Sequence, residues 1–567
     1  MSTHVINNKM VVLNFTEEYC KNEIEVLNSE CFKRVFFDFL DYMTKHERVD
    51  IIYLVSLLPE REHFIGLFKL LYSFEYDQIN DINFVYRPIL KERALLYKLV
   101  EEFYNYWRRL ERYSIIKAKK IDQGVQNMNF VDANKEFTNI ILKTYRTISE
   151  RLYGQNFSIY RQLPSGVNAS LLVNDYKWCD IKEYDYLDNI QMIESVMIRP
   201  PFMSYSKKNK RTGTYQESKT NPLLDVNLNS NDYLCYPCYV GGALAFVYFH
   251  KHFMAHGITI SNLFDFAAAK DIRDKKPNII YLFGYGDEES SFFYDKENDI
   301  YIGRAPLADS VDYFGYMKKM LLTLYNVKMI SEGGLPIHGA CVHITLKGGQ
   351  KKTVVIIGDS GAGKSETLEA LRASAGDDII DMRTIFDDMG TFKLVNGQVY
   401  AYGTEIGAFV RLDDMASDFG YKEMDRAIFM NPDAQNARLV IPVATYPEIM
   451  EGHKVDFIFY ANNYENTDNV KKFESVDEAL EVFIGGARMA KGTTGEVGLV
   501  KSFFANPFGP VQKEEKTRKL LDLYFTTLFK NNIYVGELYT KLAIPGYEQN
   551  GPKNMAVKLF DLLRGIN

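Results

Sequence analysis

The stretch KKTVVIIGDSGAGKSETLEALRAS, residues 351–374, decides the fold class of this chain. It opens with KKTVVIIG, an apolar run with the length and composition of a buried strand. The glycine-rich segment GDSGAGKS follows directly, and SETLEALRAS then has the composition of a helix. A strand, a glycine-rich loop and a helix in this order predict an α/β domain with a phosphate-binding loop.

The loop matches the pattern G-x-x-x-x-G-K-[ST] through Gly358, Gly363, Lys364 and Ser365. Glycines let backbone N–H groups close around phosphate oxygens. Lys364 would bring a charge to the β- and γ-phosphates, and Ser365 a hydroxyl to Mg²⁺. The N-terminus of the following helix favours the same anion. An accidental glycine-rich turn is the alternative, but the flanking strand and helix favour a nucleotide site. The predicted nucleotide-binding residues are Gly358, Asp359, Ser360, Gly361, Ala362, Gly363, Lys364, Ser365 and Glu366.

Two aspartate pairs are candidates for holding the divalent cation that a nucleotide requires. Asp387 and Asp388 end an apolar run in TIFDDMGTF, where a carboxylate can bind the cation directly or through water. The rival pair, Asp377 and Asp378, lies closer to the loop but follows a helix. For either pair the alternative interpretation is a solvated turn.

The composition favours a soluble cytoplasmic protein. The 567 residues suggest two to four domains, and 46% hydrophobic residues are enough for sizeable cores. A net charge of -7 gives no reason to expect a nucleic-acid partner. No apolar run approaches the ~18 residues that span a bilayer, and the N-terminus lacks a signal-peptide pattern. The six scattered cysteines do not form a disulfide framework.

The pattern along the chain predicts three regions and a mixed α/β (α+β) fold. Residues 1–125 should be mainly helical, because apolar residues recur at helical spacing between Leu96 and Leu110. A further helix is expected at about 132–152, within a mixed region that runs over 126–330. Short strand-like runs dominate from 331 onward, before the helix-like EKTRKLLDLYFTTLF. We therefore expect a two-lobed structure, with a P-loop domain over 331–567 and an extra helical N-terminal region.

Several further motifs give the chain a resemblance to a known family. YFGYMKK at 313–319 and PIHGACV at 336–342 precede the loop, while IFDDMG and NARLVIPV at 436–443 follow it. In this order they resemble the motifs of ATP-dependent phosphoenolpyruvate carboxykinase, over about 310–510. The resemblance implies a P-loop kinase fold of two lobes. It also implies the family's reaction, in which oxaloacetate loses CO₂ and the resulting enolate oxygen takes the γ-phosphoryl group of ATP.

The resemblance also implies roles for individual residues. Lys319, His338 and Asp388 would be ligands of Mn²⁺ or Mg²⁺, and Ser365 would bind the nucleotide's own metal. A lysine ligand must be neutral, so neighbouring cations such as Lys318 should lower its pKa. The predicted catalytic residues, which would contact the substrate or the transferring phosphoryl group, are Lys318, Lys319, Asp387, Arg438 and Tyr313. The cofactors would be ATP or another nucleoside triphosphate with Mg²⁺ and Mn²⁺.

The sequence also departs from the family pattern. The family's Gly-Arg-Ser-Pro-Lys-Asp-Lys motif is absent from the first 200 residues, and GRAP at 303–306 lies in the wrong place to replace it. YGTEIGAF at 402–409 stands where the family has Glu-Gly-Gly-x-Tyr-Ala-Lys, so that lysine is missing. The basic segment RPPFMSYSKKNKRTG could supply substrate cations, or could be a solvated loop. The cations in question are Arg199, Lys207, Lys208, Lys210 and Arg211.

A second family leaves the phosphoryl acceptor open. IHGA followed by GDSGAGKSE also resembles HPr kinase, a P-loop protein-serine kinase that lacks the YFGYMKK set. We therefore expect a small-molecule substrate, oxaloacetate or phosphoenolpyruvate, with a kinase acting on another small molecule or a protein hydroxyl as the alternative. A nucleotide-sensing regulator without turnover is the third hypothesis. The sequence leaves the choice of nucleotide and the oligomeric state undecided, although KGTTGEVG at 491–498 resembles the carboxykinase loop beside adenine.

One cluster has nearly the spacing of a zinc site. Cys235, Cys238, His252 and His256 follow C-x₂-C-x₁₃-H-x₃-H. The residues between them are apolar, unlike the polar exterior of a small zinc finger. We favour a buried strand or helix with incidental cysteines and histidines.

Overall fold

The computed structural model describes every residue except 1, 7–9, 16–18, 83, 118–124, 155–165, 179–180, 200, 212, 225, 375–377, 413–425, 491–497 and 566–567. The chain divides into two compact units. The first, here called the helical unit, is Met1–Asn174 with Ile193–Arg199. The second, here called the P-loop unit, is Asp175–Met192 with Pro200–Asn567. Both contain helices and strands, which confirms the mixed α/β class.

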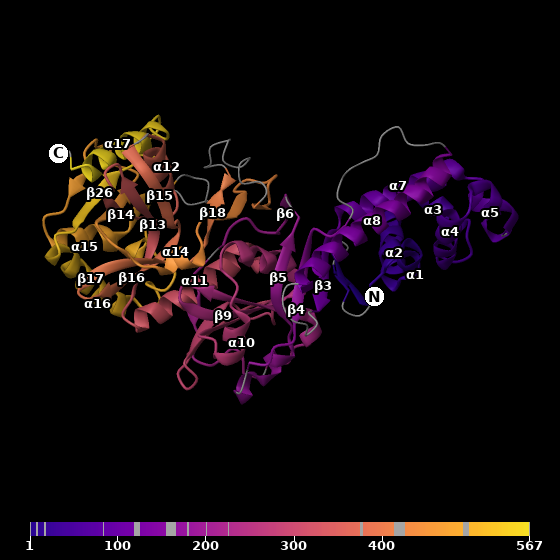
Figure 1. Ribbon diagram of the computed structural model, residues 1–567, viewed down its shortest axis with the longest axis horizontal. Helices are drawn as coiled ribbons and strands as arrows, with labels where there is room; N and C mark the ends of the chain where they lie inside the picture. The colour runs from indigo at the N-terminus through magenta and orange to yellow at the C-terminus, as the bar shows by residue number, and fades with distance from the viewer. Residues whose placement is uncertain are drawn as a thin grey trace. The chain divides into compact units, whose positions relative to one another are not determined.

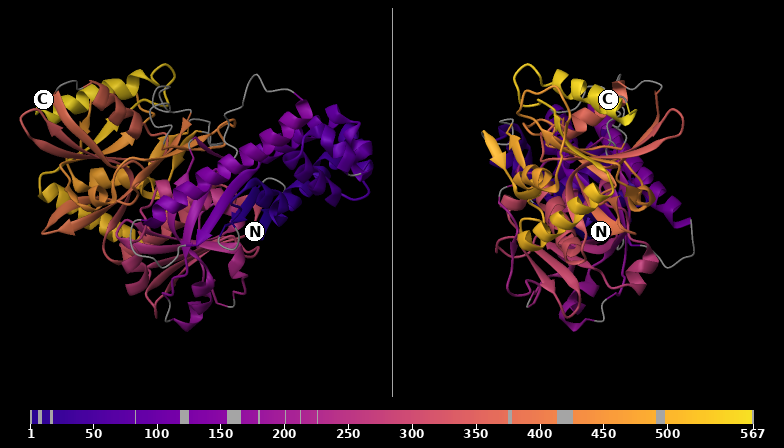
Figure 2. Two further views of the ribbon diagram at one scale, coloured as in Figure 1. Left: turned by 45° about the vertical axis from the view of Figure 1, so that its right-hand side comes forward. Right: turned by 90° about the vertical axis from the view of Figure 1, so that its left-hand side faces the viewer.

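The helical unit packs helices against a small sheet. Its strands are β1 Ser2–Ile6, β2 Met10–Asn14, β3 Glu111–Lys117, β4 Ala169–Asn174 and β5 Met192–Ile198, paired in that order. Its helices are α1 Glu23–Asn28, α2 Glu30–Lys45, α3 Val49–Ser56, α4 Glu62–Ser73, α5 Tyr76–Ile82, η1 Phe84–Tyr86, α6 Arg87–Leu90, α7 Arg93–Arg109 and α8 Val125–Tyr153. Figure 2 shows α8 as one long helix. Apolar faces of α2, α4, α7 and α8 share one core.

The predicted apolar stripe of the helical unit is confirmed as core packing. Leu96, Leu99 and Val100 of α7 are buried, because their spacing places them on one helix face. The helix expected at about 132–152 is α8. It packs on α7 and belongs to the same unit, which therefore continues beyond residue 125.

The first part of the P-loop unit is built around the buried helix α11, Phe314–Ser331. A helix that is apolar on every side must be enclosed, and α11 contacts β10 and β12 on one sheet and β13 on another. The other elements are η2 Lys182–Asn189, β6 Phe202–Ser204, β7 Gln216–Glu217, η3 Ser230–Asp232, β8 Tyr233–Val240, β9 Ala243–His250, η4 Lys251–Phe253, α9 Met254–Thr259, η5 Ile260–Asn262, α10 Ala269–Asp274, β10 Ile279–Phe283, β11 Ser291–Asp295, β12 Ile300–Ala305 and η6 Asp309–Val311.

The second part holds the P-loop sheet, in the order β21-β17-β16-β13-β14-β22-β26-β23, with β15 also paired to β13. Its strands are β13 Leu335–Leu346, β14 Lys351–Ile357, β15 Ile379–Phe386, β16 Met389–Val395, β17 Gln398–Gly403, β21 His453–Lys454, β22 Phe457–Asn462, β23 Lys471–Lys472 and β26 Tyr534–Tyr539. Its helices are α12 Lys364–Ser374, α14 Tyr446–Met450, α15 Val476–Gly485, η9 Phe503–Ala505, α16 Glu514–Lys530 and α17 Asn550–Leu563. One face of the sheet packs against α12 and α17, which lie next to each other in Figure 1, and the other against α15 and α16. The strands predicted after residue 331 are confirmed.

Two smaller sheets complete the P-loop unit. One has the order β18-β20-β19-β6, with β18 Gly407–Arg411, β19 Ile428–Met430 and β20 Arg438–Pro442. The other pairs β24 Ala487–Met489 with β25 Leu499–Lys501. Among the helices that the structure describes in either unit, none combines the length and the hydropathy needed to cross a bilayer.

Candidate active site

The predicted phosphate-binding loop joins β14 to α12. Gly361 and Gly363 have φ of +80° and +94°, a region that favours glycine because other residues are strained there. A Cβ on Gly363 would come within 2.6 Å of the Thr540 side chain, so this position tolerates no larger residue. The buried Lys364 amine donates a hydrogen bond of 3.0 Å to the backbone carbonyl of Asp359. The lysine thus folds back along the loop, as a ligand to phosphates held there requires.

Asn463, directly after β22, and Arg488 of β24 brace the loop. The Asn463 amide donates to the carbonyl of Gly361 at 2.9 Å. The Arg488 guanidinium donates to the Asp359 carboxylate at 2.7 Å. Burial favours the neutral acid, but the charges of His338 and Arg488 outweigh it and lower the pKa of Asp359. These contacts therefore help to define the shape of the loop.

Asp387 and Asp388 lie in the turn between β15 and β16, beside the loop. The Ser365 hydroxyl donates a hydrogen bond of 2.9 Å to Asp387. Burial raises the pKa of Asp387 to about 6, with Ser365 and Lys364 opposing. This pairing of hydroxyl and carboxylate matches the way a P-loop serine and a second-strand aspartate hold a nucleotide's Mg²⁺. In the rival pair, Asp378 is 3.4 Å from Arg564, and Asp377 is outside the described residues.

The Asp388 carboxylate is the centre of the site. One oxygen lies 2.5 Å from the Lys318 amine and 2.7 Å from the Lys319 amine. The other lies 3.1 Å from Nε2 of His338. The amine, imidazole and carboxylate that the sequence assigned to one metal ion therefore do meet.

The tautomer of His338 bears on what this cluster can bind. Its Nδ1 lies 2.6 Å from the Ala505 carbonyl, which can only accept, so Nδ1 carries a proton. In the neutral ring Nε2 is then a lone pair that faces the Asp388 carboxylate. Two facing acceptors need a cation between them, either a proton or a metal ion. The donor set of imidazole, carboxylate and amine fits a divalent metal.

The pKa values of Lys318 and Lys319 are shifted in opposite directions. Burial lowers the pKa of Lys319 to about 8, since the charge of Lys318 adds to it and Asp388 offsets it only in part. Burial also acts on Lys318, but Asp388 and Glu405 outweigh it and raise the pKa of Lys318. Of the two, Lys319 is therefore the amine that more easily becomes neutral.

Glu405 is a site residue that the sequence reasoning missed. Its carboxylate is 2% exposed and lies 3.0 Å from the Lys318 amine. Within the described residues neither of its oxygens has another hydrogen-bond partner. Burial raises the pKa of Glu405 to about 7, against the charge of Lys318. A lone acid in the apolar run TEIGAF was the available signal, because such an acid is seldom buried without a reason.

A second group of predicted residues gathers around the ring of Phe409. The Lys318 amine lies 5.2 Å from the ring centroid, and the Arg438 guanidinium 5.1 Å. Tyr313 packs against the same ring at 6.2 Å. Burial raises the pKa of Tyr313, with Arg438 opposing. Arg438, Tyr313 and Lys318 are therefore brought together, as the sequence predicts.

Strand β18, which carries Phe409, also supplies a cation that the sequence analysis did not predict as a site residue. The buried Arg411 pairs directly with Arg438 across β18 and β20. Like charges at directly opposite positions disfavour each other, and an anion between them removes the penalty. Side chains alternate along a strand, so Phe409 and Arg411 share a face. Arg411 thus supplies a cation close to the segment YGTEIGAF, in which the lysine of the carboxykinase pattern is missing.

Of the basic segment, Arg211 lies close to these residues. Its guanidinium lies 5.0 Å from the centroid of Phe508, whose ring also lies 4.7 Å from the Lys319 amine. Lys207, by contrast, pairs with Asp309 at 2.5 Å, and Lys208 and Lys210 are exposed. Arg199 belongs to the helical unit.

The zinc-like cluster is spread over three elements: the cysteines lie on the buried strand β8, His252 in η4 and His256 in α9. Cys235 and Cys238 lie three residues apart on β8, so their side chains point to opposite faces of the sheet. His256 lies 2.9 Å from Asp312. Among the residues that the structure describes, no three His, Cys, Asp or Glu side chains are grouped to hold a metal. The cluster around Asp388 is not a group of this kind, because one of its three side chains is a lysine.

The remaining predicted nucleotide-binding positions make fewer contacts in the site. Ser360 is exposed on the loop, and Glu366 is half-buried on α12. Most of KGTTGEVG at 491–498 is outside the described residues.

In comparisons with known proteins, no family model matches this chain, and no curated protein matches it either.

Proposed function

We propose that the P-loop unit transfers the γ-phosphoryl group of a nucleoside triphosphate with the help of divalent metal ions. The observation that carries this proposal is the convergence of Lys319 and His338 on Asp388, next to the pair Ser365–Asp387. A protein that only senses a nucleotide needs no more than the phosphate-binding loop. A second cation site beside the loop would instead stabilise the negative charge that develops while the phosphoryl group is transferred.

Two sets of residues would hold the metals. Ser365 and Asp387 would bind the metal that accompanies the nucleotide. Lys319, His338 and Asp388 would bind a second ion. Bound there, a metal would act as a Lewis acid on phosphoryl and substrate oxygens.

Within this class, conversion of oxaloacetate to phosphoenolpyruvate is the leading reaction. The C–C bond to the leaving carboxylate breaks, its electron pair passes to the enolate, and the enolate oxygen then displaces ADP from the γ-phosphorus. Both steps build negative charge on oxygen. Lys318 and Arg438 supply fixed positive charge beside Phe409, and Arg411 lies opposite Arg438 across β18 and β20. These cations would stabilise the negative charge that develops.

A kinase acting on a hydroxyl acceptor is the second candidate, and Glu405 favours it. An enolate has no proton to lose, whereas a hydroxyl nucleophile must pass one to a base. Glu405 is buried beside Lys318 with no other partner within the described residues, and could accept that proton.

The experiment incubates the full chain with oxaloacetate, Mn²⁺ with Mg²⁺, and ATP or GTP, and measures phosphoenolpyruvate and nucleoside diphosphate together. The carboxykinase reaction forms the two in equal amounts. Lys319→Ala should abolish both products, whereas Lys519→Ala, which removes an exposed lysine from α16, should not.

The diphosphate measurement separates the two candidates. Diphosphate formed only when an alcohol or protein acceptor is added, without phosphoenolpyruvate, identifies the hydroxyl kinase. In that case Glu405→Gln should lower turnover by about 10²–10⁴-fold, the usual contribution of a general base. Full activity of Lys319→Ala in either assay would contradict the proposed metal site.

A further inference from the structure

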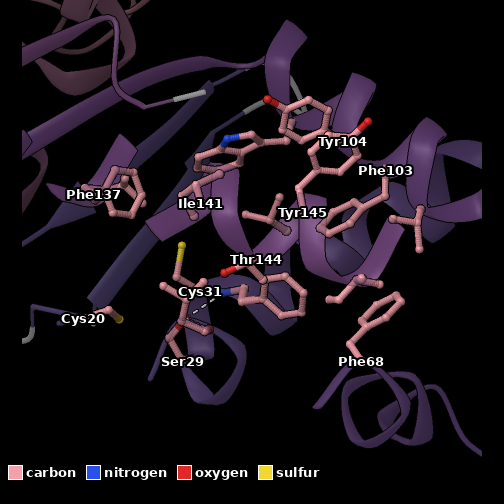
Figure 3. Close-up of a pocket in the computed structure, with 17 residues that line it drawn as sticks. Cys20, Ser29, Cys31, Phe68, Phe103, Tyr104, Phe137, Ile141, Thr144 and Tyr145 are labelled. Atoms are coloured by element: carbon pink, nitrogen blue, oxygen red, sulfur yellow. Dashed lines mark hydrogen bonds between the residues drawn. The ribbon is translucent and has the colours of Figure 1, made fainter. Parts of the chain in front are cut away.

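The helical unit contains a cavity of about 80 Å³ between α2, α4, α7 and α8. Figure 3 shows rings standing around it, with Cys20, Ser29 and Cys31 on the opposite side from Phe103 and Tyr104. One water molecule needs roughly 10–15 Å³ of such space. The cavity therefore has room for a molecule of several heavy atoms.

The wall is almost entirely apolar, and three of its hydroxyl groups are bonded within the protein. The hydroxyl of Ser29 donates to the Val26 carbonyl at 2.7 Å. The hydroxyl of Thr144 donates to the Ile140 carbonyl at 2.9 Å, and that of Tyr145 to Glu101 at 2.7 Å. Water in a cavity needs two to four polar partners. This cavity favours an apolar occupant over water.

The arrangement of the rings further narrows the chemistry of that occupant. Phe32 meets Phe68 and Phe103 edge-on, at centroid distances of 6.1 and 5.6 Å. Trp107 meets Phe137 in the same way at 6.4 Å. Edge-to-face contacts between rings are worth more than their buried area alone. A further ring in the middle would extend the pattern.

We propose that this cavity is a binding site for a small, uncharged aromatic molecule of about one ring. The site lies wholly in the helical unit and is independent of the phosphoryl transfer proposed above. Among the described residues that line it, none carries a charge, so an anionic or cationic ligand would lose its hydration without gaining a charged partner there.

Trp107 makes the site directly observable, because it lines the cavity and the chain has 2 tryptophans. In a full-length Trp178→Phe variant, bromobenzene should quench Trp107 fluorescence saturably through its heavy atom. It should also raise the unfolding temperature of the unsubstituted chain, because a ligand that binds only the folded state stabilises it. At equal concentration, 4-bromobenzoate should do neither.

A filled-cavity variant supplies the control. Ile141→Phe adds bulk to the wall and should weaken bromobenzene binding by about tenfold or more, given the cost of overpacking. Ile52→Phe makes the same change at an exposed position of α3 and should leave binding unchanged. If Ile141→Phe does not fold, Val35→Leu, which fills less space, should give a smaller loss. Non-saturable quenching, equal binding by the two phenylalanine variants, or equal binding of the charged analogue would overturn the proposal.

Discussion

Nε2 of His338 lies 3.1 Å from the Asp388 carboxylate, while its Nδ1 is held by the Ala505 carbonyl at 2.6 Å. The ring is thus oriented by one partner so that its other nitrogen faces an acceptor. Such an outer partner fixes the tautomer of a histidine that binds a metal. In the neutral ring, the lone pair of Nε2 therefore faces the Asp388 carboxylate in a fixed direction.

Replacing His338 by alanine should weaken Mn²⁺ binding strongly, because it removes one protein ligand and leaves Asp388 with the two lysines. We expect at least the 10–100-fold loss of affinity that follows from disturbing a ligand's partner. Titration followed by electron paramagnetic resonance of free Mn²⁺ measures it. His343→Ala, on the same strand, is the control because His343 bonds Thr353 instead. Equal affinity of the two variants would remove His338 from the site.

Replacing Gly363 by alanine should abolish nucleotide binding. The new Cβ would lie 2.6 Å from Thr540, and the loop would have to move away from its phosphate-binding shape. Gly348→Ala is a matched control, because Gly348 has a similar φ of +102° but nothing within 4 Å of its added Cβ. Calorimetric titration with ATP compares the two. Unchanged ATP affinity in Gly363→Ala would show that the loop does not hold the phosphates.

Replacing Arg438 by glutamine should lower turnover far more than it lowers nucleotide affinity. A cation that acts on the transferring phosphoryl group contributes about 10³–10⁵-fold to turnover. Within the described residues the buried Nε of Arg438 has no hydrogen-bond partner, as expected of a group awaiting a ligand. Steady-state kinetics separates kcat from KM, with Arg383→Gln at an exposed position of β15 as the control. A change confined to KM would assign Arg438 to ground-state binding.

Acid should destabilise the P-loop unit through His250. Burial lowers the pKa of His250 to about 4, and its Nδ1 accepts a hydrogen bond from the His252 backbone. Between the ordinary value of 6.5 and about 4, the unfolded chain binds a proton that the folded chain does not, so stability falls as pH falls.

Urea unfolding at about pH 7.5 and about pH 5 measures this effect, because stability follows the difference in bound protons. His250→Asn keeps a side-chain acceptor but does not titrate, so it should lose less stability on acidification than the unsubstituted chain. The same replacement at the exposed His46 should not alter the dependence on pH. An identical loss in His250→Asn and the unsubstituted chain would show that another group carries the effect.

Local pattern was sufficient for much of the fold. The P-loop, its strand and its helix follow from neighbouring residues, since glycine at positive φ and an apolar run act over a few positions. The stripe of α7 was predicted for the same reason. The approach of Lys319 and His338 to Asp388 was expected from a resemblance alone, because these residues lie 69 and 50 positions from it.

What local pattern could not supply was the set of contacts made by packing. The sequence shows Glu405 only as a lone acid in an apolar run, and it is the enclosure of α11 that places it beside Lys318. The aromatic cavity likewise depends on how four helices pack, of which the sequence analysis had singled out only α7 and α8. Secondary structure and loop shape arise from interactions between near neighbours in the chain. Burial, and with it the pKa of a buried group and the shape of a cavity, depends on residues far away in sequence, so it emerges only when the chain is folded.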